Sequence, residues 1–167
     1  MIQALYRSIY VHRIHTQILY DLSFGGMNPD KDSGSGFATP IRTQKRILII
    51  DDEEDVTISL SKALEQNGFK TDPYTDPVLA YKNFREGLYD LVLLDIKMPV
   101  IDGFLLYQKI RKTDSRIKIC FLTATEFFHE QIRQEHGLGG FNQESFLRKP
   151  IEIEDLVHAI RKLLKSG

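Results

Sequence analysis

The sequence lacks several features that would point to particular classes of protein. It contains one cysteine, Cys120, so no disulfide can form within the chain, and its apolar surroundings predict a small buried hydrophobe in a reducing compartment. No stretch approaches the roughly 18 apolar residues of a membrane span, and the N-terminus lacks the charged and apolar regions of a signal peptide. The formal net charge of −1 gives no reason to expect direct nucleic-acid binding. We therefore expect a cytoplasmic protein with no membrane partner.

The composition is typical of one globular domain with an extension. With 167 residues, of which 42% are hydrophobic and 27% charged, the chain has room for one sizeable core and not for two full domains. Residues 27–44 are rich in Gly, Ser, Pro and Asp without periodicity, which predicts a flexible linker. The apolar residues of 1–26 do not stay on one helix face, so this segment is an N-terminal extension with no assigned structure, or lies upstream of a start at Met27. We expect the domain at 45–167.

From Lys45 onward, short β-branched runs alternate with helical patterns, which is typical of a parallel sheet covered on both faces. Asn67–Gly68 is a helix-end signal, and Asp76–Pro77 predicts a helix start with an acidic N-cap. With right-handed crossovers, these elements predict an α/β fold with a doubly wound five-stranded parallel sheet. The expected strands are 46–51, 69–74, 90–95, 117–123 and 145–149, and the expected helices are 54–67, 76–86, 102–113, 126–137 and 152–165. The last helix should bury one face, formed by Ile153, Leu156, Val157, Ile160 and Leu164.

Chemically active side chains stand at the ends of four predicted strands. In an open parallel sheet, ligands bind outside the carboxyl ends of the strands, so residues far apart in the sequence converge there on one pocket. The residues at these ends are Asp51, Asp52, Asp95, Thr123 and Lys149. Carboxylates suit a divalent cation, while a hydroxyl and an ammonium suit phosphoryl oxygens, and one carboxylate is left over to react. The combination predicts a phosphoryl-transfer site.

Each of these residues also has a purely structural interpretation. Acids such as Asp51 and Asp52 stabilise the start of a helix, Asp95 is a plausible loop opener, and Thr is common in strands. In the functional interpretation, Asp51 and Asp52 hold Mg²⁺, one directly and one through water, and Asp95 is a nucleophile that forms an aspartyl phosphate. Lys149 then neutralises the transferred oxygens. The residues are individually ordinary, and their joint occurrence at strand ends favours the functional interpretation.

With these residues, positions 45–167 resemble the response-regulator receiver domains of two-component signalling. The matching motifs are Asp51–Asp52, Asp95 with Met98–Pro99 and Asp102–Gly103, Thr123–Ala124 and Lys149–Pro150, and Phe146 falls where the family carries its aromatic switch residue. The resemblance implies a flavodoxin-like (βα)5 fold and a phosphoaccepting Asp95. It implies Mg²⁺ bound by Asp51, Asp52, Asp95 and the backbone carbonyl of Lys97. It also implies a sensor histidine kinase or phosphotransfer protein as donor, and self-catalysed phosphoryl transfer and hydrolysis without enzymatic turnover.

Other interpretations compete with this one. A phosphatase of the haloacid-dehalogenase type also uses a strand-end Asp and Mg²⁺, but it needs a second Asp where Lys97 stands. A flavodoxin-like cofactor binder needs a Ser, Thr and Gly phosphate loop, whereas five acids, 51–55, follow the first strand. A degenerate receiver that acts only as an interaction module is the third alternative, although every site position is filled. The segment 126–144 is longer than usual in the family, which leaves open which surface a partner binds.

We expect the output to be a phosphorylation-dependent protein–protein interaction with an unidentified target. The last predicted helix is followed only by Ser166–Gly167, and the N-terminal segment is not patterned as a helix-turn-helix, so a stand-alone regulator is expected. Phosphorylation of Asp95 should draw Thr123 inward. Phe146 should then turn from exposed to buried in the vacated space, unless it is a core residue that is always buried.

Overall fold

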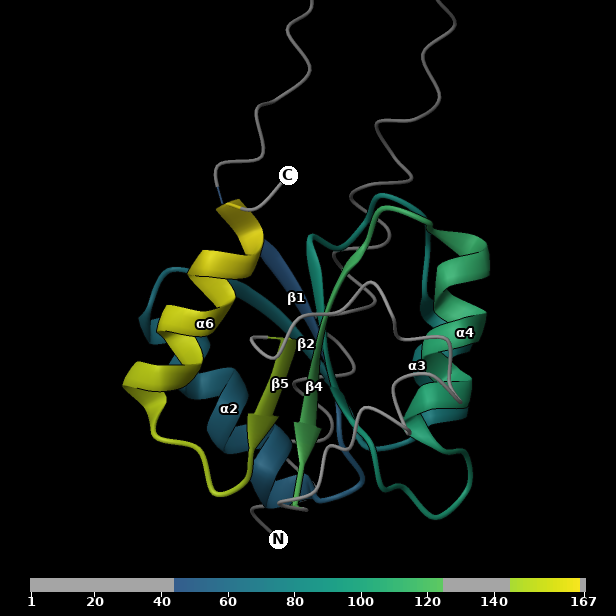
Figure 1. Ribbon diagram of the computed structural model, residues 1–167, viewed down its shortest axis with the longest axis horizontal. Helices are drawn as coiled ribbons and strands as arrows, with labels where there is room; N and C mark the ends of the chain where they lie inside the picture. The colour runs from purple at the N-terminus through teal and green to yellow at the C-terminus, as the bar shows by residue number, and fades with distance from the viewer. Residues whose placement is uncertain (1–43, 125–144, 166–167) are drawn as a thin grey trace, which may run out of the picture. The chain divides into compact units, whose positions relative to one another are not determined.

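Five parallel strands form the centre of the fold (Figure 1). The computed structural model describes residues 44–124 and 145–165. Its strands are β1 (Arg46–Ile50), β2 (Lys70–Tyr74), β3 (Leu91–Asp95), β4 (Lys118–Thr123) and β5 (Phe146–Arg148), in the spatial order β2-β1-β3-β4-β5. The order reverses direction between β1 and β3, which opens a crevice at their carboxyl ends. The predicted doubly wound five-stranded parallel sheet is confirmed.

Of the helices in the described residues, two cover each face of this sheet (Figure 1). On one face lie α2 (Glu54–Gln66) and α6 (Ile153–Lys165), and on the other lie α3 (Pro77–Asn83) and α4 (Gly103–Thr113). None of the helices in the described ranges is long and apolar enough to cross a membrane. The predicted helix 126–137, the extension 1–26 and the linker up to residue 43 lie outside the described residues.

The ends of α3 show how local chemistry sets the boundaries of a helix. The Asp76 side chain accepts hydrogen bonds from the backbone N–H groups of Val78 and Leu79, at 2.8 and 3.1 Å, as the predicted N-cap should. The helix ends at Asn83, before the predicted end at residue 86, because Phe84 is in an extended conformation and the chain turns toward β3. The start of α3 was therefore predicted correctly, and its end was predicted too late.

Two further connections lead the chain into its strands. Gly68, directly before Phe69 and β2, has a φ of 87°, which a residue without a Cβ adopts readily, as predicted for the end of α2. The last strand is shorter than predicted, since β5 ends at Arg148. The peptide bond between Lys149 and Pro150 that follows is cis. Lys149 therefore stands just beyond the end of β5.

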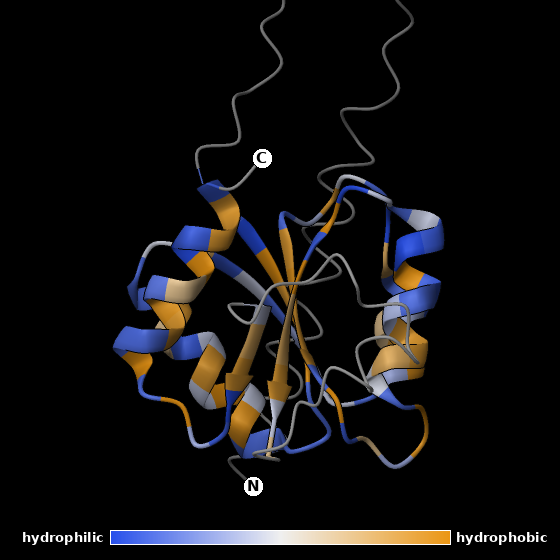
Figure 2. Ribbon diagram, viewed as in Figure 1, coloured by the Kyte–Doolittle hydropathy of each residue, from blue (hydrophilic) through white to orange (hydrophobic). Residues whose placement is uncertain are grey.

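The core consists of two clusters, one on each face of the sheet. Figure 2 shows hydrophobic residues along the central strands, between the two pairs of helices. Along β1, Leu48 and Ile50 belong to the cluster under α3 and α4, and Ile47 and Ile49 to the cluster under α2 and α6. A strand buried on both faces is a continuous apolar run, as β1 and β3 are in the sequence. The cluster under α3 and α4 contains the rings of Phe84, Tyr89, Phe104 and Phe121, with Phe146 and Tyr107 packed against it.

The cluster under α2 and α6 is mainly aliphatic. The five residues predicted for the buried face of the last helix all pack in it, and Leu163, which the prediction omitted, is buried there as well. Cys120 lies fully buried in the same cluster, and burial raises the pKa of its thiol to about 12. The thiol is therefore protonated and enclosed at neutral pH.

Candidate functional site

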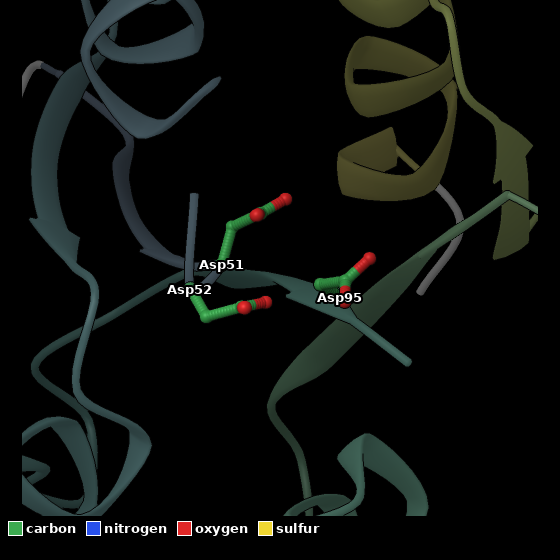
Figure 3. Close-up of side chains that lie close together, drawn as sticks. All are labelled: Asp51, Asp52 and Asp95. Atoms are coloured by element: carbon green, nitrogen blue, oxygen red, sulfur yellow. The ribbon is translucent and has the colours of Figure 1, made fainter. Parts of the chain in front are cut away.

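Three carboxylates converge at the carboxyl ends of β1 and β3 (Figure 3). Asp51 and Asp52 directly follow β1, Asp95 is the last residue of β3, and one oxygen of each lies within 4.8 Å of the others. They meet because β1 and β3 are neighbours in the sheet, paired from Ile47 opposite Leu91 onward. Asp51 and Asp95 are 0% and 4% exposed, respectively, while Asp52 is exposed. Two of the three charges are thus held out of water, which is unfavourable without a counter-charge.

The counter-charge comes from Lys149. Its Nζ lies 2.6 Å from Asp51 Oδ2 and 3.0 Å from Asp95 Oδ1, with Glu53 Oε1 farther away at 3.4 Å. The pairing of β4 with β5 delivers the lysine to this position, since the Lys149 N–H donates to the Thr123 carbonyl at 2.8 Å. One ammonium therefore faces three carboxylates, two from the connection between β1 and α2 and one from the end of β3.

This imbalance shifts the pKa values of both reactive groups. Burial raises the pKa of Asp95, and the nearby Asp51 and Asp52 raise it further, against the opposing effect of Lys149. Burial alone would lower the pKa of Lys149, but its contacts with Asp51 and Asp95 outweigh this effect and hold the pKa above its usual value. Lys149 is therefore a firmly charged ammonium, whereas the negative charge on Asp95 is only partly compensated.

The carboxylates fit a hard divalent cation such as Mg²⁺. In the described part of the chain, Asp51 Oδ2 is the one buried side-chain oxygen or nitrogen without a hydrogen bond of acceptable geometry, although Lys149 Nζ is close. The other oxygen, Oδ1, accepts the Glu53 N–H at 3.1 Å. Mg²⁺ binds proteins through one or two carboxylates and keeps several waters. A buried oxygen with spare acceptor capacity beside two other acids is what such an ion requires.

The other predicted site residues lie at the same edge or behind it. Thr123 ends β4 and is 7% exposed, and Lys97 is exposed in the loop after β3. Phe146 is half-buried, and its ring stacks on that of Phe121 with centroids 5.1 Å apart and planes 9° apart. The structure thus brings Thr123 and Lys149 to neighbouring strand ends, and it places Phe146 against the aromatic core, between full exposure and full burial.

Two residues that our sequence analysis did not assign to the site contribute to it. Glu53 contacts Lys149, as described above. Gly103 packs so closely against β3 that a Cβ on it would lie 2.2 Å from the Asp95 carbonyl oxygen, and its N–H donates to the Ile96 carbonyl at 2.9 Å. A larger residue would push α4 away from the end of β3. Asp102–Gly103 is one of the sequence motifs, but its spacing does not predict this contact with β3.

The fold and this site can be compared with known proteins. The family model of the response regulator receiver domain matches residues 47–161. The chain belongs to this family. Receiver domains are phosphoacceptor modules of two-component systems and generally bind Mg²⁺ in an acidic pocket, so the predicted class of protein is confirmed.

Curated relatives show where receiver domains like this one occur. The domain is 32% identical over 120 residues to the transcriptional regulatory protein RprY of Bacteroides fragilis, covering 72% of this chain and 49% of that protein. It is 33% identical over 122 residues to the transcriptional regulatory protein TctD of Salmonella typhimurium, covering 73% and 53%. The chain spans about half the length of the curated relatives it matches.

Solved structures give the same fold. The non-phosphorylated HemR receiver domain from Leptospira biflexa is 27% identical with a TM-score of 0.65, covering 74% of this chain and 97% of that one. A chain in the crystal structure of histidine kinase ThkA in complex with response regulator protein TrrA is 32% identical with a TM-score of 0.61, covering 73% and 100%. The receiver domain described here therefore has both the sheet and the acidic edge expected of a phosphoacceptor.

Proposed function

We propose that the protein is a response regulator that accepts a phosphoryl group on Asp95 from a sensor histidine kinase or a phosphotransfer protein. One observation carries this proposal: the buried Asp95 carboxylate lies 3.0 Å from the Lys149 ammonium and within 4.8 Å of Asp51 and Asp52. A nucleophilic carboxylate beside a phosphate-binding cation and two further oxygen ligands is the equipment that phosphoryl transfer needs.

The chemistry then follows from the side chains. An Asp95 oxygen attacks the phosphorus of a phosphohistidine, the new O–P bond forms as the P–N bond breaks, and the imidazole leaves with the bonding electron pair and takes up a proton. Lys149 neutralises charge on the transferred oxygens as a fixed ammonium. Thr123 donates its hydroxyl hydrogen to one of these oxygens. Mg²⁺, bound by Asp51, Asp52, Asp95 and the Lys97 carbonyl, would supply further neutralisation of the phosphoryl charge.

The phosphorylated state would signal through a changed protein-binding surface. The phosphoryl group adds roughly −1.5 to −2 charge and three acceptor oxygens, which draws Thr123 toward Asp95. Phe146 follows β4 because it stacks on Phe121, two residues before Thr123 in the same strand. The partner is then a cytoplasmic protein, and the domain occupies 45–167 behind the linker 27–44. The names of the curated relatives support a regulatory output, and a phosphatase is disfavoured because Lys97 stands where its acid–base Asp should be.

Incubation with acetyl phosphate and Mg²⁺, followed by intact mass measurement, tests the phosphoacceptor directly. We expect one added phosphoryl group on the wild type and none on Asp95→Asn. Asp76→Asn is a matched control, because Asn also caps helices and the Asp76 carboxylate serves as the N-cap of α3. Full labelling of Asp95→Asn would refute the assignment.

NMR spectra with and without beryllofluoride test the coupling to Phe146. We expect the largest shifts at Thr123 and Phe146, and smaller shifts along α2 on the other face of the sheet. Equal shifts on both faces would contradict the coupling.

A further inference from the structure

We propose that Glu53 is a positioning residue that holds the Lys149 ammonium in the unphosphorylated protein and competes with the incoming phosphoryl group for it. The inference deepens the proposed function and rests on it, since it concerns the same site. Glu53 is one of five consecutive acids, 51–55, and the sequence alone gives it no role different from that of its neighbours.

The contacts of Lys149 single out Glu53. An ammonium has three N–H donors and no acceptor. Lys149 Nζ has three carboxylate neighbours within 4 Å, namely Asp51 at 2.6 Å, Asp95 at 3.0 Å and Glu53 at 3.4 Å. The ammonium is therefore already surrounded by three carboxylates. An incoming phosphoryl oxygen must compete with them for it.

The longest and most exposed contact is the one that gives way. The Glu53 side chain is 65% exposed and lies farthest from Nζ, whereas the Asp51 side chain is fully buried at the shortest distance. Glu53 is the N-cap residue of α2, but its side chain makes no capping hydrogen bond, so the carboxylate is not needed by the helix. Its backbone is held by the N–H bond to Asp51 Oδ1 and by the bond from the Thr57 N–H to its carbonyl.

Glu53 therefore has two consequences for phosphoryl transfer. It keeps the Lys149 side chain at the site before the donor arrives, and it places a negative charge beside the position that an anionic phosphodonor must approach. Removing the charge while keeping the length of the side chain should weaken the competition between Glu53 and the phosphoryl group for the Lys149 ammonium. We expect Glu53→Gln to be phosphorylated by acetyl phosphate about three times faster than the wild type, because an exposed ion pair contributes only modestly.

The matched control is Glu54→Gln. Glu54 is the next acid in the chain and is also exposed, and Glu54→Gln has the same net charge as Glu53→Gln. Within the described ranges, the Glu54 side chain makes no contact with Lys149, whereas the Glu53 side chain does. We expect wild-type rates for Glu54→Gln at 0.5 M salt, where long-range fields are screened. The faster rate of Glu53→Gln should persist there, because a direct contact is screened less. Equal acceleration of both variants at 0.5 M salt would overturn the proposal.

A second measurement reports on Lys149 without phosphorylation. The ¹⁵N-ammonium NMR signal of Lys149 in the unphosphorylated protein should shift or broaden in Glu53→Gln and stay unchanged in Glu54→Gln. An unchanged signal in Glu53→Gln would overturn the proposal. A wild type that acquires no phosphoryl group overturns the proposed function and this inference with it, whereas a labelled wild type matched in rate by Glu53→Gln overturns the inference alone.

Discussion

The amino-terminal and carboxyl-terminal edges of the sheet both carry acids near cations, but they pair them differently. Near the amino ends, Arg46 contacts both oxygens of Asp72, at 2.6 and 3.2 Å, and Lys45 contacts Asp90 at 3.0 Å. Each of these acids contacts a cation directly. At the carboxyl ends, three carboxylates share the ammonium of Lys149.

Asp114, just before β4, is also well satisfied at the amino edge, mainly by backbone N–H groups. Its carboxylate accepts the backbone N–H groups of Gly87, Arg116 and Ile117 at 3.1, 2.9 and 3.2 Å. Acids that are fully satisfied by local partners stabilise a fold and have nothing left to offer a ligand. Acids that outnumber the nearby cations destabilise the folded protein through charge repulsion, and they favour binding of a further cation. The acids of the amino edge therefore serve the stability of the fold, and those of the carboxyl edge are suited to binding and chemistry.

The largest expected effect comes from making the same substitution at each edge. Asp72→Asn removes a buried charge that contacts Arg46 at two points and should lower the free energy of unfolding by about 2–3 kcal/mol. Asp95→Asn, at comparable burial, removes one charge from the crowded edge. It should raise the free energy of unfolding at neutral pH by about 1 kcal/mol, on the scale of one like-charge contact in a largely aqueous medium. Urea unfolding of the wild type and both variants measures the two signs.

Arg46→Lys serves as the control for the amino edge, since it keeps the charge and loses the two-point contact, and it should be less destabilising than Asp72→Asn. If Asp95→Asn proved as destabilising as Asp72→Asn, the two edges would be equally balanced and the comparison would be wrong.

A smaller effect is expected from Mg²⁺. An ion that binds only the folded protein at ten times its dissociation constant should raise the free energy of unfolding by about 1.4 kcal/mol. We expect this gain in the wild type and in Asp72→Asn, and little of it in Asp52→Asn. Thermal unfolding with and without Mg²⁺ measures it. An equal gain in Asp52→Asn would remove that carboxylate from the metal site.

The smallest effect is a difference in pH dependence. Burial alone would raise the pKa of Asp114, but the backbone N–H groups of Gly87, Arg116 and Ile117 outweigh it and lower the pKa. The stability that Asp114 contributes is therefore complete above the unfolded pKa of about 3.9 and is lost as the pH falls through the lower folded value. The cost of Asp114→Asn should accordingly be full at neutral pH and shrink in acid.

Asp95 has the opposite sign. Because its pKa is raised in the folded protein, its ionised form costs stability, and this cost appears as the pH rises from about 3.9 through the folded pKa. The gain from Asp95→Asn should thus be absent in acid and full at neutral pH. Melting temperatures of both variants at pH 3 and pH 7 check the two trends, and parallel trends would contradict them.

The sequence was sufficient for the parts of the site that depend on strand ends. Asp51 and Asp95 follow continuous apolar runs, and parallel strands share one carboxyl edge, so their convergence follows from the fold class. The Asp76–Pro77 pair likewise set the start of α3. Chemistry that is local, or common to a whole sheet edge, could therefore be predicted.

Contacts that depend on a single long-range placement could not be predicted. Glu53 and Lys149 are 96 positions apart, and nothing in a run of five acids indicates which one meets the lysine after β5. The same limit explains Leu163, because an amphipathic helix presents a broad apolar face and its neighbours decide which residues at the margin are buried. The end of α3 at Asn83 was set by the turn to β3 and not by a breaker residue at the predicted position.

The enclosure of Cys120 makes this thiol a natural probe of local opening in the domain. The protein has a single thiol, and the aliphatic cluster under α2 and α6 surrounds it. A thiol reagent can modify it only when that side of the domain opens, so the labelling rate of the unmodified protein records the opening frequency directly. Comparing the labelling rate before and after phosphorylation would report whether phosphorylation of Asp95 loosens or tightens the packing under α2 and α6. Labelling of newly introduced surface cysteines would meanwhile suffer little from reaction at Cys120, because that thiol is buried.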